Sequence, residues 1–307
     1  MTKRIAYFDC FSGASGDMLL GALLDSGLSL EELTADLDRL GVGGYELRLT
    51  RQVRHGISGS KFDVLDKGEE RPARHLSRVR EIIGNSGLPE PVITSAIRVF
   101  ERLAEVEANI HGTTIEEIHF HEVGAVDALV DIVGFCCGIH RLGIEELYAS
   151  PLPLGSGSVR TEHGLLPVPA PATLALLASV GAPTLPSGAQ GEMVTPTGAA
   201  LLTTLARFER PAIKVQQVGY GFGTKEFPWA NLLRVWIGDS LDARALGGPH
   251  RHEPEPAHHH HHEHDGHEHH DHDHNHGHHS HDHHSHSHEH EHEPHGEHEE
   301  HEHPHQP

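Results

Sequence analysis

The sequence lacks the residue types that mark several classes of protein. Its 307 residues contain three cysteines, of which Cys136 and Cys137 are adjacent, so we expect reduced thiols rather than a disulfide framework. No run of Lys and Arg provides the charge that neutralises phosphates in a nucleic-acid binder. The longest uncharged stretch, residues 164–191, contains five prolines and offers no segment of the roughly 20 apolar residues that span a membrane. No apolar leader precedes the first predicted strand. We therefore expect a cytoplasmic protein that binds neither nucleic acid nor membranes.

Histidine and negative charge are concentrated at one end of the chain. Of the 35 histidines, 28 lie within residues 250–307, together with 15 acidic residues and one basic residue. The same segment has no aromatic side chain, and Ala257 is its one aliphatic residue. Such a segment cannot bury enough apolar surface to offset the entropy cost of ordering. The sequence therefore predicts a globular domain at residues 1–248 and a disordered, metal-binding tail at residues 249–307.

Strand and helix patterns alternate along the predicted globular domain. An apolar strand over residues 3–9 precedes a helical pattern over residues 17–26. One continuous strand is predicted over residues 145–154, and the glycine-rich residues 219–223 are expected to link two late strands. This mixture predicts an α/β fold, with a mixed α+β arrangement as the alternative.

The histidines of the tail suit a transition-metal role. Imidazole binds nickel, zinc, copper and cobalt, and a flexible chain can supply several ring nitrogens to one ion. A protonated ring cannot bind metal, so uptake should fall in acid. A purification tag or a solubility tail is the alternative, although the interleaved Asp, Glu and Ser residues favour metal handling. The first run of candidate ligands is His258, His259, His260, His261 and His262.

A second candidate site combines two histidines with three acids. His119 and His121 share one face if the backbone there is extended, and Asp127 and Asp131 share one face of the helix predicted to follow. That helix is apolar nearly all round, which indicates burial, and buried carboxylates need partners. We expect His119, His121 and Asp131 to bind metal and Glu122 or Asp127 to act as a base. The alternative is that one histidine caps the junction and the aspartates are ordinary surface charges.

A third candidate site is the small-residue loop between the first strand and the first helix. Its backbone N–H groups and the helix N-terminus favour an anion, although Asp9 and Asp17 at its two ends would repel a bare phosphate unless a cation bridged them. A tight turn without a ligand is the alternative. Cys10 in the same loop is either a thiolate ligand or a small core residue. The candidate cofactor-binding residues are Ser12, Gly13, Ser15, Gly16 and Asp17.

Three motifs together resemble a known family. FDCFSGASGDM at residues 8–18, HFHEVGAVDALVDIVG at residues 119–134 and VPAPATLALL at residues 168–177 are similar to the nickel-insertion protein of the lactate racemase maturation system. The resemblance spans residues 1–245 and extends to the histidine-rich segment that follows. In that family a further C-terminal domain, or a separate chain, continues past this segment and is assigned the nucleotide site.

The resemblance implies a CTP-dependent nickel chelatase, a lyase. Its substrate is pyridinium-3,5-bisthiocarboxylic acid mononucleotide, which takes up Ni²⁺ through two sulfur–nickel bonds and one carbon–nickel bond to give a nickel-pincer nucleotide. CTP would bind with Mg²⁺ or Mn²⁺, and lactate racemase would receive the product. The resemblance also implies that this chain needs the C-terminal part for activity. The alternatives are a nickel-storage protein or metallochaperone without catalysis, and a metal-dependent hydrolase.

Overall fold

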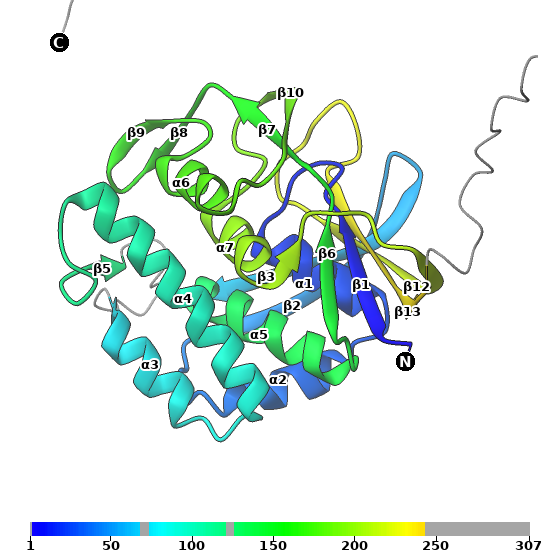
Figure 1. Cartoon of the computed structure of the whole chain (residues 1–307), viewed down its shortest axis with the longest axis horizontal. Helices are drawn as coiled ribbons and strands as arrows, with labels where there is room; N and C mark the ends of the chain where they lie inside the picture. Colours follow the sequence, from blue (N-terminus) through cyan, green and yellow to red (C-terminus); the bar gives the residue numbers. More distant parts are fainter. Residues whose placement is uncertain (1, 68–73, 121–125, 243–307) are drawn as a thin grey trace, which may run out of the picture. The chain divides into compact units, whose positions relative to one another are not determined.

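A mixed β-sheet of seven strands runs through the residues that the computed structural model describes, which are 2–67, 74–120 and 126–242 (Figure 1). The interior strand β1 pairs in parallel with β6 and antiparallel with β13, so both of its edges are hydrogen-bonded. The strands, in spatial order, are β11 (Ala206–Arg207), β6 (Glu146–Ala149), β1 (Arg4–Asp9), β13 (Leu232–Ser240), β12 (Ile213–Phe222), β3 (Ile57–Asp66) and β2 (Tyr45–Arg54).

Helices are interleaved with these strands along the sequence, so the predicted mixing of α and β structure is confirmed. The described helices are α1 (Gly16–Asp25), α2 (Leu30–Asp38), α3 (Leu76–Gly84), α4 (Glu90–His111), α5 (Val126–Arg141), α6 (Pro171–Val180) and α7 (Pro196–Leu205). Three short two-stranded ladders complete the described structure, formed by β4 (Arg74–His75) with β5 (His119–Phe120), β7 (Leu152–Ser156) with β10 (Thr184–Gln190), and β8 (Ser158–Thr161) with β9 (Gly164–Pro167).

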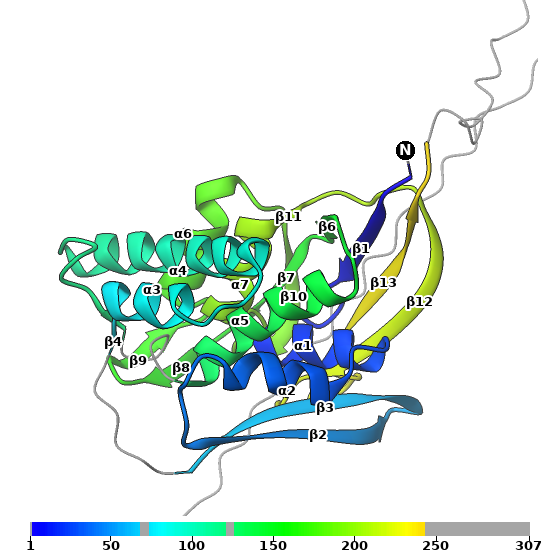
Figure 2. The same cartoon turned by 90° about the horizontal axis from the view of Figure 1, so that it is seen from below.

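The helices stack in layers on one face of the sheet (Figure 2). Helix α1 packs on β3 and β12, α5 packs on α1, and α4 packs on α5. Eight of the ten residues of α1 are buried, as expected of a helix with neighbours on nearly all sides. Phe8 of β1 meets Phe135 of α5 with ring centroids 5.5 Å apart, which joins the sheet to the second helical layer.

Two glycines let α1 approach the sheet closely. A Cβ atom at Gly221 would lie 1.9 Å from the carbonyl oxygen of Met18, and one at Gly219 would lie 2.0 Å from that of Ala22. The predicted link at residues 219–223 is therefore wrong for residues 219–222, because β12 continues through them to Phe222. The glycines serve helix–strand packing there, rather than a turn.

The predicted single strand over residues 145–154 is also wrong, because the structure divides it. β6 ends at Ala149 and β7 begins at Leu152, and the two strands belong to different sheets. Pro151, which stands between them, has no N–H to donate to a ladder. The predicted boundary between residues 248 and 249 lies outside the described residues. In the part of the chain that is described, no helix is both long and apolar enough to cross a membrane.

Candidate functional site

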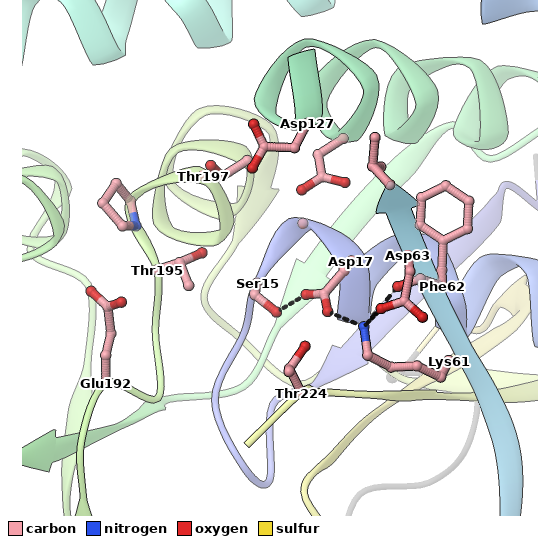
Figure 3. Close-up of a pocket in the computed structure, with 14 residues that line it drawn as sticks. Ser15, Asp17, Lys61, Phe62, Asp63, Asp127, Glu192, Thr195, Thr197 and Thr224 are labelled. Carbon is pink, nitrogen blue, oxygen red and sulfur yellow. Dashed lines mark hydrogen bonds and ion pairs between the residues drawn. The ribbon is translucent and has the colours of Figure 1, made fainter. Parts of the chain in front are cut away.

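Three helices begin at the wall of one pocket (Figure 3). Helix α1 begins at Gly16, α5 at Val126 and α7 at Pro196, so the pocket faces N-terminal ends that carry partial positive charge. Its volume is about 380 Å³. It is lined by Ser15, Gly16, Asp17, Lys61, Phe62, Asp63, Val64, Asp127, Asp131, Glu192, Thr195, Pro196, Thr197 and Thr224.

Two distant loops meet to bring α1 and α7 together. The N–H of Ala14 donates to the carbonyl oxygen of Met193 at 3.0 Å, and the N–H of Thr195 donates to that of Ala14 at 3.0 Å. Small residues make this contact feasible, because a Cβ at Gly13 would lie 2.0 Å from the Met193 oxygen and one at Gly198 would lie 2.3 Å from the Ala14 oxygen. Gly13 thus contacts the neighbouring loop at a positive φ of 96°, which glycine adopts without strain.

A buried lysine connects two carboxylates at one side of the pocket. Lys61 Nζ lies 2.7 Å from Asp17 Oδ2 and 2.7 Å from Asp63 Oδ1, and it also donates to the carbonyl oxygen of Phe62 at 2.8 Å (Figure 3). Burial alone lowers the pKa of the Lys61 ammonium, but attraction to Asp17 and Asp63 outweighs burial and raises this pKa overall. Asp17 also accepts hydrogen bonds from Ser15 Oγ and from the N–H of Met18. Lys61 therefore remains a cation that neutralises part of the acidic pocket.

Asp131 is the least satisfied group in the pocket. Its Oδ1 atom is buried and has no hydrogen-bond partner among the described residues. Its Oδ2 atom lies over the start of α1, where a Cβ at Gly16 would be only 2.2 Å away. Burial raises the pKa of the Asp131 carboxyl well above its ordinary value, Asp17 and Asp127 raise it further, and Lys61 opposes them. A cation bound here would supply the countercharge that the described side chains do not fully provide.

Asp127 lies one helical turn before Asp131 on the exposed side of α5. The surrounding protein partly desolvates the Asp127 carboxyl group and so raises its pKa. The N–H of Ala128, which donates to Asp127 Oδ1 at 2.8 Å, lowers this pKa, and the negative charges of Asp66 and Asp17 raise it further. A carboxylate of raised pKa that still reaches solvent can accept a proton from a ligand and release it to water.

The structure brings five of the predicted site residues together, namely Ser15, Gly16, Asp17, Asp127 and Asp131. Ser12 and Gly13 do not line this pocket. Ser12 is buried and accepts a hydrogen bond from Trp229 Nε1 at 3.1 Å. Cys10 is fully buried, and burial raises the pKa of its thiol, which favours the core-residue interpretation over the thiolate ligand.

The predicted histidine ligands fall largely outside the described residues. His119 lies in β5, where its backbone pairs with His75, but its side chain is not described. His121, Glu122 and the five histidines at 258–262 lie outside the described residues. Within the described ranges, no three His, Cys, Asp or Glu side chains are grouped closely enough to hold a metal ion.

Sequence reasoning missed several pocket residues that come from other elements. Lys61 and Asp63 lie on β3, and a lysine in an otherwise half-apolar strand was the available signal. Thr195 caps α7 by accepting from the N–H of Gly198 at 3.2 Å. A capping residue in a sequence indicates the start of a helix but does not indicate a pocket. Nothing in the sequence pattern singled out Glu192 or Thr224. The missed polar residues that line the pocket are Lys61, Asp63, Glu192, Thr195, Thr197 and Thr224.

The chain is similar in sequence to known proteins over most of its length. A family model described as "Nickel insertion protein" matches residues 6–291. The "Putative nickel insertion protein" of Roseiflexus castenholzii is 54% identical over 236 residues, which are 77% of this chain and 60% of the relative. The "Pyridinium-3,5-bisthiocarboxylic acid mononucleotide nickel insertion protein" of Desulfitobacterium hafniense strain DCB-2 is 51% identical over 241 residues, 78% of this chain and 59% of the relative. Its counterpart in strain Y51 is 50% identical over the same length and shares. The chain thus spans about three-fifths of the length of these relatives. No solved structure matches the chain.

Proposed function

The chain belongs to the nickel insertion protein family, and from that premise we propose that its pocket delivers Ni²⁺ to pyridinium-3,5-bisthiocarboxylic acid mononucleotide, the compound in the names of two relatives. In this activity nickel is a substrate rather than a resident cofactor. The observation that carries the proposal is the buried, partly unsatisfied carboxylate of Asp131 beside Asp17 and Asp127.

A divalent cation fits this arrangement for electrostatic reasons. Asp131 has Asp17 and Asp127 as charged neighbours of its own sign, and Lys61 balances them only in part. Nickel is bound by carboxylate oxygen and imidazole nitrogen. We therefore propose Asp131 as one nickel ligand, with His119 and His121 as further ligands during transfer. The substrate's two sulfur atoms would then replace these protein ligands.

The transfer needs a base. In the proposed reaction the ring carbon between the two thiocarboxylates loses its proton, and the electron pair of that carbon–hydrogen bond forms the carbon–nickel bond. No oxidant or reductant is required. Asp127 accepts the proton in this scheme, because its pKa is raised and its side chain reaches both the pocket and solvent. Glu122, on the segment before α5, is the alternative base.

The acidic pocket is not suited to a triphosphate. Asp17, Asp127 and Asp131 would repel phosphates that no cation bridges. We therefore assign CTP, with Mg²⁺ or Mn²⁺, to the part of the longer relatives that this chain does not match, supplied by a C-terminal domain or by a separate chain. The product would pass to lactate racemase.

Nickel storage or delivery without catalysis is the alternative function. The histidine-rich segment at residues 249–307 favours it, because storage needs many exchangeable ligands. A pocket with a poorly satisfied carboxylate at the junction of three helices favours catalysis, because storage does not need such a site.

The test is nickel insertion by the full chain together with the C-terminal part, CTP, Mg²⁺, Ni²⁺ and the dithiocarboxylate mononucleotide. Asp127→Asn and His121→Ala are each expected to reduce cofactor formation at least ~100-fold, with nickel uptake by the tail unchanged. Asp38→Asn, an exposed aspartate of α2, serves as the matched control. Near-normal product formation by both variants would move the site away from this pocket.

A further inference from the structure

Two further hollows adjoin the acidic pocket, and we call this row of three hollows the groove. A second hollow of about 170 Å³ shares Ser15, Asp17 and Glu192 with it. A third hollow of about 200 Å³ shares Lys225 and Phe227 with the second. The three hollows therefore follow one another from α5 to the turn between β2 and β3.

The two ends of this groove carry opposite charge. The first pocket presents five carboxylates and one lysine, Lys61, whereas the third hollow presents Arg54 and Lys225 together with His55 at the turn. Glu226 is the one acid that lines the third hollow. A phosphate group is therefore repelled at the first pocket and attracted at the third hollow. The thiocarboxylates at the other end of the substrate are also anionic, and Ni²⁺ held in the first pocket would attract them.

The basic end is organised by contacts within the chain. Arg54 Nη1 donates to the carbonyl oxygen of Gly223 at 2.7 Å, and Arg54 Nε donates to Gln52 Oε1 at 3.1 Å. The guanidinium carbon lies 5.2 Å from the centroid of the Phe222 ring, which fixes the plane of the guanidinium. Lys225 is exposed and donates from Nζ to the carbonyl oxygen of Glu192 at 3.0 Å, so it borders both the second and the third hollow. An arginine and a lysine held in this way suit a phosphate group.

An aromatic pair lies beside these cations. The rings of Phe227 and Trp229 stack with centroids 5.4 Å apart and planes 20° apart. Trp229 Nε1 donates to Ser12 Oγ at 3.1 Å, so the loop that precedes α1 positions this aromatic wall. Ser12 therefore contributes to the groove through Trp229 rather than by contact with a ligand.

We propose that this groove holds the substrate mononucleotide in one orientation, with its phosphate at Arg54 and Lys225 and its pyridinium ring in the acidic pocket. The ribose lies between them, along Phe227 and the shared wall of the second hollow. This inference rests on the proposed function. It also names the residues that select a mononucleotide over a nucleoside. The reverse orientation would place the phosphate against Asp17, Asp127 and Asp131.

The test is equilibrium binding to the full chain of two probes, nicotinic acid mononucleotide and nicotinic acid riboside, which differ by one phosphate. We expect the mononucleotide to bind at least ~10-fold more tightly, since a charge-assisted phosphate contact contributes that much or more. Lys225→Gln and Arg54→Gln should each remove most of that ratio and leave riboside binding unchanged. Lys214→Gln, an exposed lysine near the opposite end of β12, should keep the ratio. Thermal unfolding of each variant checks that the fold is retained.

Two outcomes would overturn this assignment: equal binding of the two probes, or an unchanged ratio in both variants. Either outcome leaves the nickel-insertion assay with Asp127→Asn as an independent test of the proposed function. Conversely, the chain could prefer the mononucleotide over the riboside, and lose that preference in both variants, while inserting no nickel. That result would support the groove as a mononucleotide site and reject the proposed function.

Discussion

At the scale of single residues, Asp131 connects stability to function. Its carboxyl is buried with one unpartnered oxygen, and its pKa lies well above the ordinary value because of burial and the neighbouring Asp17 and Asp127. Keeping an ionised carboxylate in such a place lowers the stability of the metal-free fold. Strained or destabilised groups of this kind are common where a ligand later compensates them.

Asp131→Asn is therefore expected to stabilise the metal-free protein at neutral pH. The folded-state pKa of Asp131 lies above the unfolded value, so the folded chain binds more protons, and this residue lowers stability as the pH rises from about 4 through the folded-state pKa. Asn does not titrate, so the Asp131→Asn variant does not lose stability in this way. Its melting temperature in the presence of a chelator should exceed that of the parent by at least ~2 °C at pH 7.5 and should match it at pH 4. A variant that melts lower at pH 7.5 would mean that the carboxylate is satisfied.

At the scale of secondary-structure elements, the contact between α1 and β12 places the loop before α1 at the pocket. Gly221→Ala would put a Cβ atom 1.9 Å from the Met18 carbonyl oxygen, so the helix would have to move off the sheet. We expect a loss of about 2–3 kcal/mol in unfolding free energy, the upper part of the range for overpacking. Gly188→Ala in β10, where nothing lies within 4 Å of the added atom, should change it by less than ~0.5 kcal/mol. Equal effects in chemical denaturation would contradict this packing.

Many of the helices and strands could be predicted from the sequence, because local residue patterns determine them. Residues 29–32 read SLEE, a capping-box sequence that predicts the start of a helix, and Ser29 Oγ does accept from the N–H of Glu32 at the start of α2. The predicted strand at residues 3–9 and helix at residues 17–26 match β1 and α1 within one residue at each end. The prediction of a link at residues 219–223 was wrong for residues 219–222, because glycines occur both in turns and where elements pack closely. Only the three-dimensional fold distinguishes these two uses of glycine.

The candidate site could be predicted only in part, because some of its residues lie in local motifs and others come from distant segments of the chain. Asp17 and Asp127 lie in the first turns of α1 and α5, and Asp131 is a charged residue in an otherwise apolar stretch of α5, so all three are conspicuous in the sequence. Lys61 and Asp63 reach the pocket from β3, and their role depends on a pairing between β3 and β12 that joins distant segments. Arg54 is far from Lys225 and Trp229 in sequence and lies beside them only in the folded chain.

At the scale of the whole molecule, the histidine-rich segment and the pocket are assigned different tasks. We expect residues 249–307 to hold nickel in reserve, because their histidines outnumber those of the rest of the chain fourfold, while the pocket performs the transfer. A chain that ends at Pro249 should lose most bound Ni²⁺ but keep its metal-free melting temperature within ~2 °C. A larger fall would mean that the segment stabilises the fold.

Nickel uptake by the full chain should also depend on pH. Imidazole with a pKa near 6.5 must be neutral to bind metal, so the amount bound should fall strongly between pH 7 and pH 5 in isothermal titration. Equal stoichiometry at the two pH values would identify carboxylates as the main ligands.

Single-turnover nickel transfer by Asp131→Asn tests most directly whether this pocket delivers nickel. The full chain is loaded with Ni²⁺ and mixed with the C-terminal part, CTP, Mg²⁺ and the dithiocarboxylate mononucleotide, and the nickel bound to the mononucleotide is measured by mass spectrometry. The parent and Asp38→Asn should give comparable nickel-bound product, and Asp131→Asn should give less than ~1% of it, a loss expected when a charged metal ligand is removed. Because this variant is expected to be the more stable protein, unfolding cannot explain such a loss. Product formation by Asp131→Asn within twofold of the parent would contradict a role for this pocket in nickel insertion.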